Sequence, residues 1–120
     1  MGKTLSYEFL EPGYKLLIVH RRLFREDRSR FFAGTVDAFN ENSGLLRITG
    51  HTWAPKAIGR GFVRKDQKRT KVLALGSGTV IVYVLPMDAD LDKLKFEDRQ
   101  DDGFRLTDGK NFNFDMNESA

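Results

Sequence analysis

The sequence predicts a mainly β protein: a small, strongly bent, five-stranded antiparallel barrel with a C-terminal β-meander extension. The first observation is residues 31–53, where two apolar runs of strand length flank the turn-forming residues ENSG. The second is that Gly34 and Gly50 each interrupt one of these runs, because a glycine inside a strand marks a bend or a close backbone approach. The third is that both runs contain β-branched residues, which suit a pleated surface.

The segment before this hairpin supplies one further strand. Residues 3–12 are weakly patterned, and a short N-terminal helix or an extended arm fits them equally well until Pro12-Gly13 breaks the pattern. Residues 14–24 are expected to form a strand with a buried apolar centre at 16–19. Residues 25–30 contain only polar and charged side chains, so we expect a solvated turn there.

After the hairpin, residues 54–71 are expected to be the longest irregular stretch, with a brief strand at 61–64. The runs 72–75 and 79–85 flank Gly76-Ser77-Gly78. This pattern predicts either two strands at a tight corner or one long strand that is kinked at the glycines. Pro86 ends the run because it cannot donate a hydrogen bond to a strand ladder.

A C-terminal extension of about 87–116 follows a body of about 14–86, and we expect one domain over residues 1–120. Aspartates at 88, 90 and 92 surround Leu91, which predicts a single helical turn with an aspartate cap. Residues 95–99, 104–107 and 111–115 predict a small meander. Its last turn contains Asp108-Gly109, a dipeptide that favours a type I′ hairpin.

The charge is distributed unevenly between these two parts. Residues 1–87 hold 15 Lys and Arg against 7 Asp and Glu, whereas residues 88–120 hold 5 against 10. A basic body with an acidic tail suggests a polyanionic partner for the body. The alternative is that these charges only keep a β protein soluble.

Several classes of function have no support in the sequence. The absence of cysteine excludes disulfides, thiolate metal sites and cysteine nucleophiles. No apolar run reaches membrane-spanning length, so no membrane partner and a cytoplasmic location are expected. We interpret His20 and His51 as structural, and the Asp88–Asp92 pattern lacks the glycine and glutamate of a calcium loop. We therefore expect no catalytic residue, no metal site, no cofactor and no enzymatic activity.

The feature of the sequence that indicates a function is the occurrence of basic residues near aromatic ones. Five arginines crowd residues 21–30, and seven basic residues crowd 54–71 beside Trp53 and Phe62. Arginine pairs with phosphate, and aromatic rings stack on bases, so these segments predict binding of RNA or single-stranded DNA. If both segments lie at one end of the barrel, they make one positive surface. The candidate nucleic-acid-binding residues of the long loop are Arg60, Arg64, Lys65, Lys68 and Arg69.

The hairpin also resembles a known family. The pattern F-x-G-x-V-x-x-F-N followed by G-L-L-R-I, over residues 32–48, resembles the first motif of the Sm-like superfamily, small bent barrels that assemble into RNA-binding rings. Gly34 falls where that family bends its second strand, and Phe39 where it places a buried aromatic. Residues 72–85 are similar to its second motif, with Gly76 at the family's glycine.

The resemblance implies a cyclic homo-oligomer in which the last barrel strand pairs with the neighbouring subunit. Asn42 corresponds to the family's base-contacting asparagine, which adds Asn40 and Asn42 to the candidate nucleic-acid-binding residues. The chain departs from the family at Asn40, where an aspartate is usual, and at Leu75, where an arginine of the base pocket is usual. The resulting hypothesis is a non-catalytic, Sm-like oligomeric barrel that binds RNA or single-stranded DNA. The alternative is a structural or protein-interaction ring with no nucleic-acid ligand.

Overall fold

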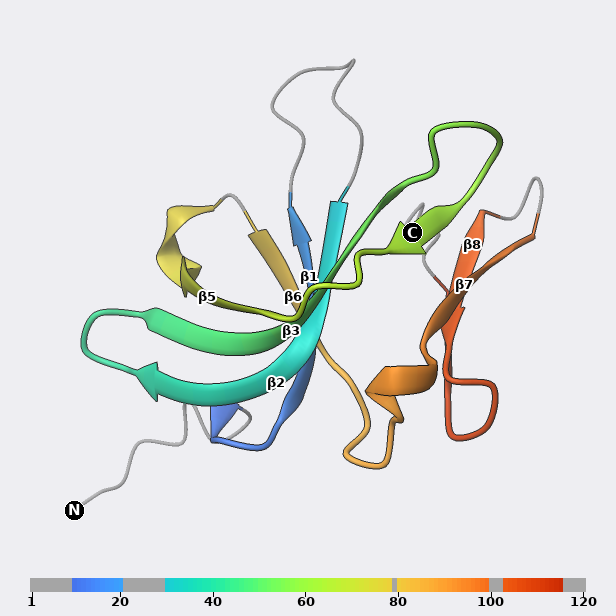
Figure 1. Cartoon of the computed structure of the whole chain (residues 1–120). Coiled ribbons are helices and arrows are strands. Elements are labelled where there is room, and N and C mark those ends of the chain that lie inside the picture. The colour runs from blue at the N-terminus through green and yellow to red at the C-terminus, as the bar shows by residue number, and fades with distance from the viewer. Residues whose placement is uncertain (1–9, 21–29, 79, 100–102, 116–120) are drawn as a thin grey trace.

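Two antiparallel sheets make up most of the regular structure in the computed structural model, which describes residues 10–20, 30–78, 80–99 and 103–115 (Figure 1). The strands of the larger sheet are β1 (Lys15–His20), β2 (Arg30–Asn40), β3 (Leu45–Pro55), β4 (Phe62–Arg64), β5 (Arg69–Ala74) and β6 (Val80–Val84). The strands of the smaller sheet are β7 (Lys95–Asp98), β8 (Phe104–Thr107) and β9 (Asn113–Asp115). The predicted mainly β fold class is confirmed.

The larger sheet is arranged around the predicted hairpin, which β2 and β3 form. Its strands follow the order β4-β3-β2-β1-β6, and β5 pairs with β3 on the same edge as β4. In the described residues β6 pairs only with β1, and β5 only with β3, so no closed barrel is found and that part of the prediction is not confirmed. The sheet has six strands instead of the expected five, because β3 extends beyond its pairing with β5 and β4 pairs with that end.

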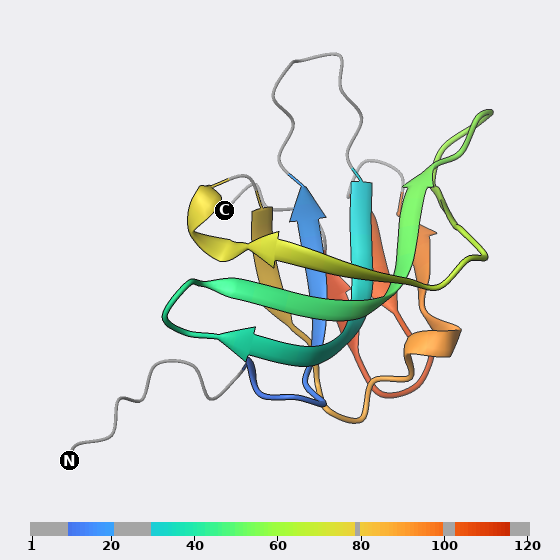
Figure 2. The ribbon, with the colours of Figure 1, turned by 60° about the vertical axis from the view of Figure 1, so that its left-hand side comes forward.

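In the hairpin Gly34 and Gly50 lie directly opposite each other. Both β2 and β3 are strongly curved (Figure 2). A Cβ atom on Gly50 would overlap the carbonyl oxygen of Ala33 and would lie 2.5 Å from the Cα atom of Gly34. A Cβ atom on Gly34 would likewise overlap the carbonyl oxygen of Thr49. Only glycine at both positions permits this backbone approach, which confirms the close approach that the sequence predicts.

The alternation of side chains along the bent strands produces two separate hydrophobic clusters. The concave face of the larger sheet holds an inner cluster of Leu10, Leu16, Ile18, Phe32, Val36, Leu46 and Ile48. The opposite face packs against the C-terminal extension through an outer cluster of Leu17, Phe31, Ala33, Trp53, Leu85, Ala89, Leu94 and Leu106. The outer cluster includes aromatic contacts, because the ring of Phe96 lies 5.0–5.2 Å from those of Phe31, Phe62 and Trp53.

The extension forms the predicted meander, with strand order β7-β8-β9. The predicted helical turn is a 3-10 turn, η3 (Leu91–Lys93), and the Asp90 side chain caps it by accepting from the backbone N–H of Asp92. The predicted two-residue turn at Asp108-Gly109 is wrong, because Thr107 pairs with Asn113 and residues 108–112 form a longer loop. The Asp108 carboxylate holds that loop by accepting from three of its backbone N–H groups, and from that of Asp90. Burial alone would raise the pKa of Asp108, but these four donors lower that pKa far below its usual range.

Two other sequence-based expectations are resolved in the described residues. The runs around Gly76 form two strands at a corner, because a 3-10 turn, η2 (Leu75–Ser77), and Gly78 with φ +78° separate β5 from β6. Residues 54–71 are less irregular than predicted, since β3 continues to Pro55 and β5 already begins at Arg69. The brief strand expected at 61–64 is β4. The expectations for residues 3–9, 21–29 and 116–120 lie outside the described residues.

We expect Gly50→Ala to destabilise the fold by about 3 kcal/mol, because the new methyl group would overlap the backbone of β2. Gly76→Ala is the matched control, since a Cβ atom there meets nothing within 4 Å. The control should change the unfolding free energy by less than about 1 kcal/mol. Urea denaturation of both variants provides the measurement. Equal stability of the two variants would contradict the close approach at the bend.

Candidate nucleic-acid interface

The inward-facing positions of the larger sheet change from apolar to basic toward one end of the strands. On β1 the inner-cluster residue Ile18 is followed two residues later by His20, and on β2 Phe32 is preceded by Arg30. His20 and Arg30 are direct partners across the two strands. On β5, Leu73 faces inward, and the side chains two and four residues before it, at 71 and 69, share that face. Both of these residues are basic.

These residues line a pocket of about 730 Å³, which we call the basic pocket. Its described lining residues come from β1, β2, β3, β5 and the connection between β4 and β5: His20, Arg30, Thr52, Lys65, Asp66, Gln67, Arg69 and Lys71. Arginine and lysine supply four of them, whereas Asp66 is the only acid among them. The pocket therefore combines a strong positive charge with three neutral side chains that can form hydrogen bonds.

Lys71 connects the pocket to the inner cluster. The Nζ atom of Lys71 lies 4.7 Å from the ring centroid of Phe32, which is a cation–π distance. Phe32 itself is fully buried, as are Ile18 and Ile48 beside it in the inner cluster. At least one cation of the pocket thus lies against the packed hydrophobic core.

Burial and nearby like charges both disfavour the charged forms of two of these groups. Burial lowers the pKa of His20, and the nearby charges of Lys71 and Arg30 lower it further. Burial also lowers the pKa of Lys71, with further contributions from Arg69 and Arg30. Because His20 binds fewer protons in the folded protein than in the unfolded chain, its contribution to stability falls as the pH drops below its ordinary pKa of 6.5.

Ion pairs do not neutralise this charge within the described part of the chain. There, no carboxylate lies within 4.0 Å of the side-chain nitrogens of Arg30, Lys65, Arg69 or Lys71. Arg69 donates to the Oε1 atom of Gln67 at 3.0 Å, which is a neutral partner. A bound anion would therefore meet cations that have little competition from internal carboxylates.

The structure divides the basic residues that the sequence selected. Lys65 and Arg69 line the basic pocket. Arg60 is instead held by the extension, because its Nε atom lies 2.7 Å from Asp98 Oδ2 and its guanidinium 5.4 Å from the Phe104 ring centroid. Arg64 also faces the extension and donates to the carbonyl oxygen of Asp92 at 3.5 Å.

The two asparagines of the predicted site lie elsewhere, in the turn of the β2–β3 hairpin. The Oδ1 atom of Asn40 accepts from the backbone N–H groups of Asn42 and Ser43, both at 3.0 Å, and so fixes the turn. This turn contacts the corner between β5 and β6, where Leu75 donates to the carbonyl oxygen of Gly44. The basic pocket begins at the other end of β2, at Arg30. Asn40 and Asn42 are therefore not brought together with Lys65 and Arg69.

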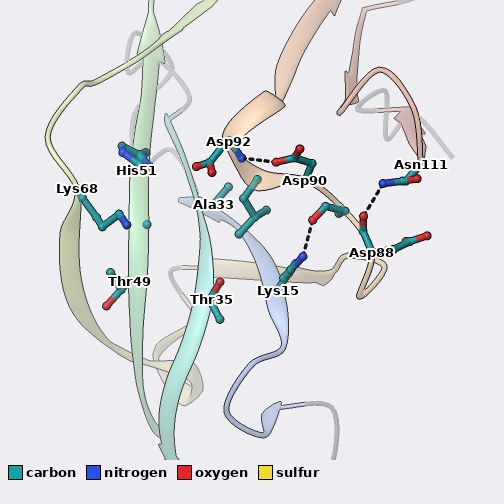
Figure 3. Close-up of a pocket in the computed structure, with 13 residues that line it drawn as sticks. Lys15, Ala33, Thr35, Thr49, His51, Lys68, Asp88, Asp90, Asp92 and Asn111 are labelled. Carbon is teal, nitrogen blue, oxygen red and sulfur yellow. Dashed lines mark hydrogen bonds between the residues drawn. The ribbon is translucent and has the colours of Figure 1, made fainter.

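Lys68 lines a second hollow of about 480 Å³ on the opposite face of the sheet (Figure 3). There Lys68 and His51 face the segment that carries Asp88, Asp90 and Asp92. Burial lowers the pKa of His51, Arg64 and Lys68 lower it further, and Asp92 and Asp66 oppose them. This hollow has mixed charge, so it is less suited to a polyanion than the basic pocket.

Internal contacts occupy several polar groups of this second hollow. Lys15 donates to the carbonyl oxygen of Ala89 at 2.5 Å, and Asn111 donates to that of Asp88 at 2.5 Å. In the described ranges, no group of three or more His, Cys, Asp or Glu side chains could hold a metal ion. In the same ranges, no helix is both long and apolar enough to cross a membrane.

The predicted site residues omit six of the described lining residues of the basic pocket: His20, Arg30, Thr52, Asp66, Gln67 and Lys71. Arg30 and Lys71 do belong to the two basic segments that the sequence indicated. The signal for three of these six was present, because strand alternation places residues 20, 30 and 52 on the face of the buried residues 18 and 32. His20 and Arg30 line the same pocket as Lys65, Arg69 and Lys71. The other arginines of the first turn lie outside the described residues.

No protein-family model, no curated protein and no solved structure matches this chain.

Proposed function

We propose that this protein is a non-catalytic module that binds RNA or single-stranded DNA at the basic pocket. The observation that carries the proposal is the convergence of Arg30, Lys65, Arg69 and Lys71 from separate elements on one hollow with a single acid. Affinity for single strands comes largely from such cations along the phosphate backbone, so this arrangement suits a polyanion. The neutral donors and acceptors of Thr52 and Gln67 are available for hydrogen bonds to a sugar or a base.

The proposed architecture is an Sm-like barrel that the curved larger sheet forms. Support for it comes from the bend at Gly34 and Gly50 and from the pairing of β6 with β1, which brings the last strand of the body beside the first. In this proposal the nucleic-acid strand binds at the basic pocket, which lies at the opposite end of the β2–β3 hairpin from its turn. That placement follows the charge, since residues 40–44 include no Lys or Arg.

The proposal includes a cyclic homo-oligomer. In the described residues β5 and β6 each pair along one edge only, and both strands carry exposed apolar side chains: Val72, Ile81 and Val84. An unpaired apolar edge favours pairing with another chain. Light scattering tests this directly, because a ring gives an integral multiple of the chain mass of 13.7 kDa. A single-chain mass at micromolar concentration would contradict the ring without affecting the binding proposal.

The double variant Lys65→Gln/Arg69→Gln should bind a labelled single-stranded oligonucleotide about tenfold more weakly than the unaltered protein. Both side chains are exposed, so the loss should come from binding and not from folding. The slope of log K against log salt should fall in magnitude by about 1.4 if each residue neutralises one phosphate. Fluorescence anisotropy between about 50 and about 200 mM salt measures both quantities.

Arg47→Gln/Lys110→Gln is the matched control, because it removes the same charge from exposed positions outside the pocket. This control should retain most of the affinity. Equal losses in the two double variants would mean that net charge alone drives binding. Failure of the unaltered protein to bind at low salt would refute the proposed function and favour a protein-interaction role.

A further inference from the structure

The basic pocket adjoins the inner cluster at Lys71. The ammonium group of Lys71 lies over the ring of Phe32, which is fully buried. Lys71 therefore contributes its charge to the pocket from a half-buried position against the apolar core.

The cations that line the pocket come from different elements. Arg30 comes from β2, Lys71 from β5, and Lys65 from the connection between β4 and β5. An internal phosphodiester carries one negative charge, whereas a terminal phosphate monoester carries about −1.5 to −2 and has three strongly accepting oxygens. Three cations that line one pocket match the charge of the monoester better than that of the diester.

The half-buried position of Lys71 also favours a dianionic ligand. Its ammonium group is partly removed from water and lies near other cations, so burial, Arg69 and Arg30 all disfavour the charged form and lower its pKa. A dianion in the pocket offsets these effects more fully than a monoanion does. Thr52 and Gln67 add neutral hydrogen-bonding groups to the same pocket.

We propose that the basic pocket binds the terminal phosphate monoester of an RNA or DNA strand, with Arg30, Lys65 and Lys71 as its main contacts. This inference rests on the proposed function and adds the part of the ligand that the pocket recognises. Further nucleotides of the strand leave the pocket toward solvent.

The test compares four probes with the full-length protein: one oligonucleotide with a 5′-phosphate, with a 3′-phosphate or with hydroxyls at both ends, and inorganic phosphate alone. We expect one of the phosphorylated strands to bind about tenfold more tightly than the hydroxyl-ended strand. Arg30→Gln should reduce this preference to about twofold or less, whereas Arg47→Gln should preserve it. Both arginines are exposed, so neither variant is expected to disturb folding.

Each outcome separates the two proposals. Equal affinity for phosphorylated and hydroxyl-ended strands would overturn the terminal-phosphate inference while leaving the proposed function intact. No binding of any strand would overturn both. Inorganic phosphate that binds as tightly as the phosphorylated strand would overturn the assignment to a strand end. An unchanged preference in Arg30→Gln would place the recognition outside the basic pocket and would also overturn the inference.

Discussion

The backbone contact between Gly34 and Gly50 is the constraint on which the arrangement of the larger sheet depends. No side chain fits between the two strands at this point, so β2 and β3 approach closely and bend together. The bend allows one strand, β3, to pair with β5 along one part of its edge and with β4 along another. The inner cluster then lies on the concave face, and the C-terminal extension covers the opposite face.

The same bend and the strict alternation of strand side chains determine where the charges gather. Residues two apart share a face, so the positions that continue the inner cluster beyond Ile18 and Phe32 are His20 and Arg30. In the loop before β4, by contrast, the extension contacts a basic residue directly. Arg60 pairs with Asp98 and lies over the Phe104 ring. The C-terminal part of the chain thus engages Arg60, Arg64 and Lys15 of the body. Its described hydrogen bonds and ion pairs do not involve the cations of the basic pocket.

Local sequence signals predicted much of the fold, because hairpins, glycine bends and capped turns depend on neighbouring residues. The β2–β3 hairpin and the cap by Asp90 were predicted in this way, and the corner at Gly76 was one of two predicted alternatives. The loop 108–112 was not, since its conformation depends on how the Asp108 carboxylate gathers backbone donors, including that of the distant Asp90. Clustering by sequence selected Lys65 and Arg69, which both line the basic pocket, but it could not show that Arg60 meets Asp98 across the fold.

The titration of His20, followed by NMR, tests most directly whether the cations converge on one pocket. The account predicts a pKa below the ordinary 6.5, because burial, Lys71 and Arg30 all disfavour the imidazolium ion. Arg30→Gln should raise this pKa and leave that of His51 unchanged, whereas Lys68→Gln should raise only the pKa of His51. A His20 pKa at or above 6.5, or one that does not respond to Arg30→Gln, would contradict the convergence of charge.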